Sequence, residues 1–152
     1  MSTSITVNII VSDDLDVALP VEAGLIEDYG AAVLGGCGVQ EAEVNVIFVS
    51  DDFMTELNKQ YKGREGTTDV LSFNLSDDKD SLLEGEIYIS YTKARGQAVD
   101  FGQPFDREIL RLVTHGLLHL SGRVHVTPEE RDGMERDTDM WLDRFYNEGG
   151  MS

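Results

Sequence analysis

The sequence is poor in cysteine and proline, with one cysteine and three prolines in 152 residues. A single cysteine excludes an internal disulfide framework and a zinc site built from several cysteines. No stretch approaches the roughly 18 apolar residues that a membrane-spanning helix needs. The first ten residues hold no basic residue, and their apolar run is too short for a signal peptide. We therefore expect a cytoplasmic protein without a membrane partner.

Positive charge is also scarce. Twelve Lys and Arg stand against 29 Asp and Glu, which gives a formal net charge of −17, and residues 1–50 contain no Lys or Arg. This balance argues against a protein that holds nucleic acid by broad basic coverage, and we expect no DNA binding. It argues equally against a polybasic membrane binder.

The length is that of one domain, so we expect residues 1–152 to form a single unit. Segments rich in β-branched residues or with alternating polarity predict four strands, at 5–11, 44–49, 69–73 and 85–91. Helical spacing and end signals predict helices at about 20–36, 50–60, 92–99 and 104–120, and from 127 onward. The sum is an α/β (α+β) domain with a mixed sheet of about four strands and a helical layer.

The helix predicted at 104–120 should be the most buried one. Its apolar residues fall on one arc of the helical wheel: Ile109, Leu112, Val113, Gly116, Leu117 and Leu120. Gly122 is expected to end it, because glycine readily adopts the left-handed conformation after a last helical turn.

All three histidines, His115, His119 and His125, fall within eleven residues. His115 and His119 are four residues apart, so both project from one side of the predicted helix. The turn at Gly122 lets His125 approach the same point. Three converging imidazoles are the usual ligand set of a catalytic zinc site, which keeps its fourth position for water or substrate. We expect one Zn²⁺ per chain.

The histidine pattern, H-x-x-x-H-x-x-G-x-x-H, matches the spacing of metzincin proteases. Those enzymes need a glutamate directly after the first histidine as the general base. This chain has Gly116 there, which disfavours proteolysis. A metal hydrolase of another substrate remains an alternative.

The segment from His115 to His125, H-G-L-L-H-L-S-G-R-V-H, resembles the signature H-G-x-L-H-L-x-G-Y-D-H of the YbeY family. Residues 57–63 and 68–73, L-N-K-Q-Y-K-G and T-D-V-L-S-F, are similar to its L-N-x-x-Y-R-G and T-D-V-L-S-F blocks. Residues 85–90, G-E-I-Y-I-S, resemble its G-D-I-x-I-S strand. The resemblance covers about residues 45–145. The members of the YbeY family are bacterial zinc-dependent endoribonucleases of ribosomal RNA maturation.

The resemblance implies a single-strand-specific endoribonuclease that processes the 3′ end of 16S ribosomal RNA and takes part in small-subunit quality control. Its implied partners are ribosomal RNA, the small ribosomal subunit and that subunit's assembly GTPase. A non-catalytic, zinc-containing ribosome assembly factor is the main alternative. Two departures favour that alternative: Arg123-Val124 replace the family's Tyr-Asp, and Lys62 replaces an Arg.

Cations near the histidines are the candidate catalytic and substrate-binding groups. Lys62 is a candidate for catalysis and phosphate contact, although lysine lacks the two-pronged geometry of arginine. Arg123 is a second catalytic candidate, beside the last histidine. Further candidates for substrate binding are Arg64, Arg111 and Ser72. Arg111 could instead pair with Glu108 or Asp106, and Ser72 could simply be hydrogen-bonded within its strand.

Overall fold

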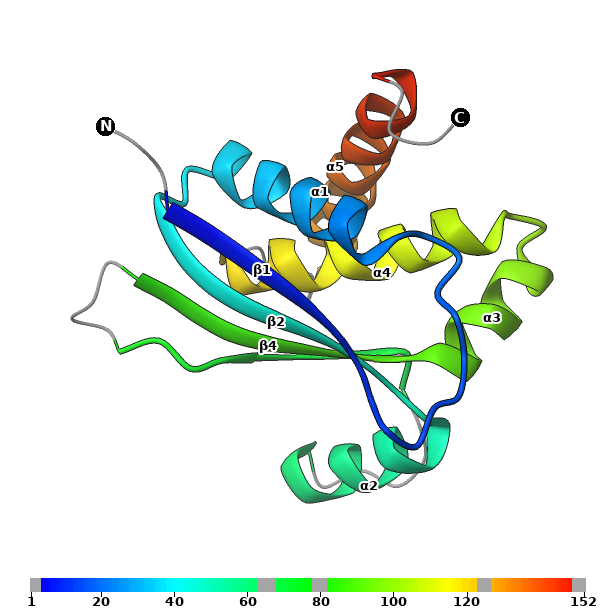
Figure 1. Cartoon of the computed structure of the whole chain (residues 1–152). Helices are drawn as coiled ribbons and strands as arrows, with labels where there is room; N and C mark the ends of the chain where they lie inside the picture. Colours follow the sequence, from blue (N-terminus) through cyan, green and yellow to red (C-terminus); the bar gives the residue numbers. More distant parts are fainter. Residues whose placement is uncertain (1–3, 63–67, 78–81, 123–126, 149–152) are drawn as a thin grey trace.

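The computed structural model describes residues 4–62, 68–77, 82–122 and 127–148 (Figure 1). Four strands and five helices follow one another along this part of the chain. Their bounds are β1 Ser4–Val11, α1 Ala23–Gly36, β2 Glu41–Val49, α2 Asp51–Lys62, β3 Val70–Asn74, β4 Leu82–Ser90, α3 Tyr91–Asp100, α4 Phe105–Leu120 and α5 Pro128–Asn147. The predicted fold class, a mixed sheet of four strands with a helical layer, is confirmed.

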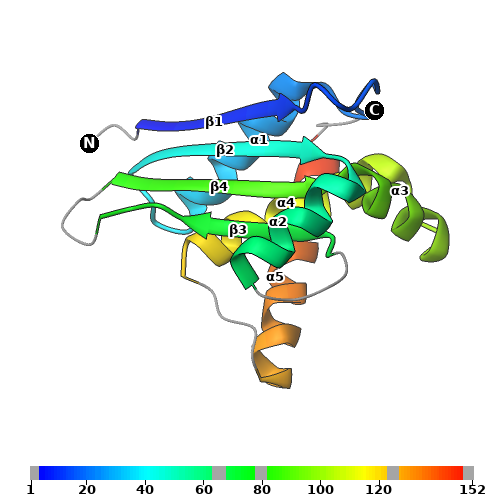
Figure 2. The same cartoon turned by 90° about the horizontal axis from the view of Figure 1, so that it is seen from below.

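The sheet has the strand order β1-β2-β4-β3 (Figure 2). Strands β1, β2 and β4 are parallel, and β3 runs antiparallel to β4 at one edge. The register places Val46 of β2 between Ile9 of β1 and Ile87 of β4. Val46 and Ile87 are fully buried, so this row faces the main core.

Helices α1 and α4 cover one face of the sheet, while α2 lies against the other (Figure 1). The main core lies on the α1 and α4 side. A smaller core forms on the α2 side, where Met54 and Leu57 of α2 meet Leu71 of β3. Helix α5 packs outside this layer, against α4.

Helix α4 is the central buried helix that the apolar arc predicts. Ile109, Leu112, Val113 and Leu117 are all fully buried. Gly122 follows the helix with a φ of +105°, a conformation that favours glycine. The sequence therefore identified both the face that this helix buries and the residue that turns the chain after it.

The starts of three elements differ from the prediction by three residues. Helix α1 begins at Ala23, after Glu22 at the N-cap, and not at Pro20. Strands β2 and β4 each begin three residues earlier than expected, at Glu41 and Leu82, because residues 41–43 of β2 pair with residues 82–84 of β4. There Leu75 donates a backbone hydrogen bond to Glu84, at 2.8 Å. None of the described helices combines the length and apolar character that crossing a bilayer requires.

Candidate active site around His115

The C-terminal half of α4 carries His115 and His119 one turn apart. The side chain of His115 is 18% exposed, while His119 is exposed. His115 therefore lies at the edge of the core, while His119 faces solvent. The third predicted ligand, His125, is outside the described residues.

The Nε2 atom of His115 is buried and makes no hydrogen bond with the described residues. It lies 3.1 Å from Oε1 of Glu135 on α5. The pair does not form a hydrogen bond, so we treat the contact as electrostatic. A buried ring nitrogen without a hydrogen bond is a candidate ligand atom.

The charge state of His115 also suits a ligand. Burial lowers the pKa of its imidazole below the ordinary value of 6.5, and the positive charge of Arg111 lowers it further. The carboxylates of Glu135, Asp69 and Glu108 act in the opposite direction but do not outweigh burial. His115 is therefore neutral at neutral pH, which is the form that binds a metal.

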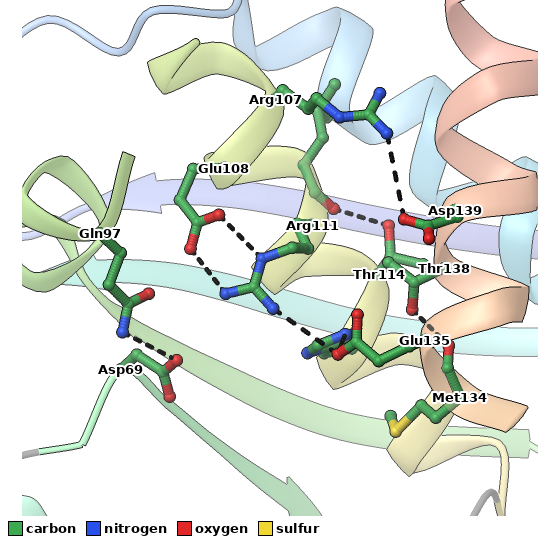
Figure 3. A network of polar contacts seen from close by, with 12 residues as sticks. Asp69, Gln97, Arg107, Glu108, Arg111, Thr114, Met134, Glu135, Thr138 and Asp139 are labelled. Carbon is green, nitrogen blue, oxygen red and sulfur yellow. Dashed lines mark hydrogen bonds and ion pairs between the residues drawn. The ribbon is translucent and has the colours of Figure 1, made fainter. Parts of the chain in front are cut away.

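Arg111 lies one turn before His115 and is hydrogen-bonded to Glu108 (Figure 3). Its Nε and Nη2 atoms donate hydrogen bonds of 2.8 and 2.7 Å to the two carboxylate oxygens of Glu108. Glu108 is only 2% exposed, and this pairing raises the pKa of Arg111. The pairing with Glu108 that the sequence left open is therefore present. The remaining nitrogen, Nη1, is 3.8 Å from Oε1 of Glu135.

Asp69, directly before β3, also acts on His115 through its charge. Gln97 donates a hydrogen bond of 3.3 Å to Asp69, as Figure 3 shows. The backbone oxygen of Asp69 accepts a further bond from the Ser90 amide, at 2.9 Å. Asp69 is thus anchored from two sides, by α3 and by the end of β4.

The remaining predicted site residues are placed as follows. Ser72 is half-buried in the middle of β3, on the same face as Val70, which packs into the α4 core. Lys62 is the last residue of α2, on the opposite face of the sheet. A site shared by Lys62 and His115 would therefore have to form around the edge strand β3. Arg64 and Arg123 lie outside the described residues.

Among residues 4–62, 68–77, 82–122 and 127–148, no three His, Cys, Asp or Glu side chains gather closely enough to hold a metal ion. The described part of the chain supplies two of the three predicted histidines. Of these, His115 fits a metal by its neutral charge and its buried nitrogen without a hydrogen bond. A complete set would need His125.

Sequence reasoning missed Glu135 and Asp69 as neighbours of His115. Glu135 reaches the histidine only because α5 packs against α4, and no spacing along the chain encodes that contact. The nearest signal was the predicted helix after Thr127. Its capping box is present, with the Thr127 side chain accepting from the Glu130 amide at 3.1 Å. That motif predicts where α5 starts but not which face meets His115.

Comparisons with known proteins show the family of the chain. The family model described as "Endoribonuclease YbeY" matches residues 25–146. Endoribonuclease YbeY of Desulfitobacterium hafniense (strain Y51) is 42% identical over 123 residues, covering 74% of this chain and 78% of the relative. The protein of the same name from Bacillus subtilis (strain 168) is 38% identical over 119 residues, covering 71% of this chain and 76% of the relative.

A solved structure shares the fold. The solution structure of TM1509 from Thermotoga maritima superposes with a TM-score of 0.60 and 25% sequence identity. The match covers 95% of this chain and 94% of that one. The likeness therefore extends from β1 to α5, well beyond the histidine motif.

Proposed function

The chain belongs to the YbeY endoribonuclease family, and from this premise we propose that it is a metal-dependent endoribonuclease of single-stranded RNA. The observation that carries the proposal is the buried, neutral His115 Nε2, which makes no hydrogen bond with the described residues. It sits in the helix whose sequence matches the family motif. We further propose that the substrate is ribosomal RNA, cleaved at the 3′ end of the 16S molecule during small-subunit maturation.

We propose His115, His119 and His125 as the ligands of one zinc ion per chain. Zinc held by three imidazoles acts as a Lewis acid and can bring the pKa of a bound water to about 7. The chain's own contribution is to hold the ligands. Burial keeps the His115 ring neutral, and close packing of α4 on β4 fixes the backbone that carries it.

The RNA backbone requires cations, and we propose Lys62, Arg64 and Arg123 as its contacts, with Lys62 and Arg123 nearest to the chemistry. Nε and one N–H of Nη2 of Arg111 already donate to Glu108, so only the other N–H of Nη2 and those of Nη1 can contact substrate. A Ser72 hydroxyl on the α4 side of the sheet could donate to a phosphate or ribose oxygen.

The net charge of −17 opposes long-range attraction of RNA. We therefore propose that affinity for free RNA is low and that a larger assembly in the cytoplasm presents the substrate. The small ribosomal subunit and its assembly GTPase are the proposed partners. A basic ribosomal surface would offset the repulsion that the protein alone cannot overcome.

A cleavage assay with matched variants tests the activity. Purified protein is incubated with a single-stranded RNA and with the same sequence as a duplex, before and after treatment with a chelator and after return of zinc. We expect cleavage of the single strand, loss with chelator and recovery with zinc. His119→Ala is the informative variant because this side chain is exposed, so the fold should survive its loss.

Two outcomes would contradict the proposal. Equal cleavage by wild type and His119→Ala, insensitive to chelator, would indicate a contaminating nuclease. A wild type that binds zinc and associates with small subunits but cleaves no RNA would favour the non-catalytic assembly factor. The sequence departures at Lys62 and Val124 make that second outcome the main rival.

A further inference from the structure

A row of four aromatic side chains lies on the α2 side of the sheet. Tyr61 of α2 contacts Phe73 of β3 edge to face, with their ring centroids 5.2 Å apart. Phe73 contacts Tyr88 of β4 in the same manner at 5.8 Å, and Tyr88 stacks on Phe53 of α2 at 6.2 Å. We propose that Tyr61, at one end of this row, stacks on an unpaired base of the RNA substrate. The inference rests on the proposed function in requiring that RNA is the ligand.

The exposure of Tyr61 distinguishes it from side chains that only hold α2 in place. Phe73 and Tyr88 are half-buried and pack against the smaller core. Met54 and Leu57 already anchor α2 there, with exposed fractions of 0% and 9%. Tyr61 is 65% exposed, the largest value for an aromatic side chain in the described part of the chain. Its ring is therefore held from one side by Phe73 and open to a ligand on the other.

The charges of α2 favour an anionic chain at this end of the row. The first turn of the helix carries Asp51 and Asp52, whereas the last turn carries Lys59 and Lys62. A phosphate backbone is repelled by the two aspartates and attracted by the two lysines. Tyr61 shares the last turn with these lysines. An exposed aromatic ring in a basic setting is the combination by which proteins hold single-stranded nucleic acid.

Stacking supplies affinity that the charge of this chain does not. The net charge of −17 leaves little long-range attraction for RNA. Stacking between a base and an aromatic ring acts at contact, and every base presents a face for it. A chain that is short of cations therefore depends on such contacts more than a basic protein does.

Edge strand β3 lies between Tyr61 and the candidate active site. Phe73 and Ser72 are neighbours on β3, so they face opposite sides of the sheet, Phe73 toward α2 and Ser72 toward α4. His115 lies on α4, which packs against β3. In the described part of the chain β3 is the last strand of the sheet, so only one strand separates the two faces here (Figure 2). An RNA strand that crosses this edge can hold a phosphate near His115 and a base against Tyr61.

This placement gives a physical reason for a preference for single strands. In an RNA duplex the bases are paired and stacked on one another, so their faces are not free to meet Tyr61. An unpaired base can turn out of the strand and lie against the ring. Tyr61 is therefore a positioning residue, which holds the RNA without touching the reacting atoms.

RNA binding by variants of the full chain tests the inference. The affinity of the metal-loaded protein for a short fluorescent single-stranded RNA is measured by anisotropy at low salt, in the cold and before measurable cleavage. Tyr61→Leu keeps an apolar side chain but loses the ring, whereas Tyr61→Phe keeps the ring. Phe101→Leu is the matched control, because Phe101 is a 61% exposed ring directly after α3. We expect Tyr61→Leu to weaken binding about 5- to 150-fold, while the other two variants bind like wild type.

Abasic RNA locates the contact. Each nucleotide of the same RNA is replaced in turn by one without a base. We expect one position to weaken binding to wild type by the same factor as Tyr61→Leu, and to cost nothing further in that variant. In steady-state cleavage, Tyr61→Leu should raise KM and leave kcat unchanged. If the variant instead lost the same affinity for every abasic RNA, it would act through the fold and the inference would be wrong.

The other outcomes are equally decisive. Wild-type affinity in Tyr61→Leu, or an equal loss in Phe101→Leu, would overturn the inference. Normal RNA binding by Tyr61→Leu with weaker association to small ribosomal subunits would assign the ring to a protein contact and overturn it as well. If Tyr61→Leu fails to fold, the abasic RNAs decide, since binding to wild type that needs no particular base contradicts stacking. In each of these cases the proposed function stands as long as wild type cleaves the RNA with zinc. A wild type that neither binds nor cleaves RNA would overturn both.

Discussion

Gly116 of α4 lies so close to Ile87 of β4 that a methyl group at this glycine would meet the isoleucine Cγ2 at 2.7 Å. The residue directly before it is His115. The absence of a side chain at Gly116 thus lets α4 pack closely against β4. His115, directly before this glycine, then lies at the edge of the core as a candidate ligand. The same glycine that disfavours a protease by its chemistry is required here by packing.

Gly116→Ala should therefore destabilise the protein. Alanine is the better helix former by about 1 kcal/mol, but overpacking in a tight core costs about 1–3 kcal/mol. We expect a net loss of about 1 kcal/mol in the free energy of unfolding, measured by urea denaturation. Gly96→Ala in α3 is the matched control, because nothing lies within 4 Å of its added methyl group. If Gly116→Ala were as stable as that control, the packing argument would be wrong.

Glu108 should be important for stability although it is charged. It is 2% exposed, and its carboxylate holds Arg111 through two short hydrogen bonds. Removing one member of a buried pair leaves the other charge uncompensated, at a cost of about 3 kcal/mol. We expect Glu108→Ala to lose about that much in urea denaturation. Glu148→Ala, which breaks an exposed pair with Arg144, should change stability by less than about 1 kcal/mol.

Tyr29 should make the protein less stable at alkaline pH. Burial raises the pKa of its hydroxyl from 10.0 to about 12. The unfolded chain therefore releases this proton from about pH 10, while the folded chain retains it until about pH 12. The contribution of Tyr29 to the free energy of unfolding is fully present below about pH 10. It is lost between about pH 10 and about pH 12, by at most about 2.7 kcal/mol.

The comparison with Tyr29→Phe isolates this contribution. The free energy of unfolding is measured at several pH values across that window for both proteins. Tyr146 also has a raised pKa, so some alkaline loss will remain in the variant. We expect the wild type to lose stability more steeply than Tyr29→Phe. Parallel curves would show that the Tyr29 hydroxyl titrates alike in the folded and unfolded states.

Much of the site was predictable because it depends on local sequence. The spacing of His115 and His119, the apolar arc of α4 and the glycine after it are properties of one helix. The turn at Gly122 and the start of a helix at about residue 127 are likewise encoded within a few residues. Each was predicted from sequence and each is present.

The contacts between elements were not predictable in the same way. The strand order β1-β2-β4-β3 depends on which hydrophobic faces meet across the whole chain. The approach of Glu135 to His115 depends on how α5 packs on α4, and the bidentate hold of Glu108 on Arg111 depends on the burial of α4. Sequence spacing could suggest a pair such as Glu108 and Arg111, three residues apart, but not that the core would enclose it.

The zinc content of the purified protein tests the central claim most directly. The account predicts one zinc per wild-type chain by elemental analysis and a sharp loss in His119→Ala, whose folding is verified by circular dichroism. RNA cleavage by the same samples should fall in parallel with the metal. Unchanged zinc content in a folded His119→Ala protein would contradict the assignment of the histidines as ligands.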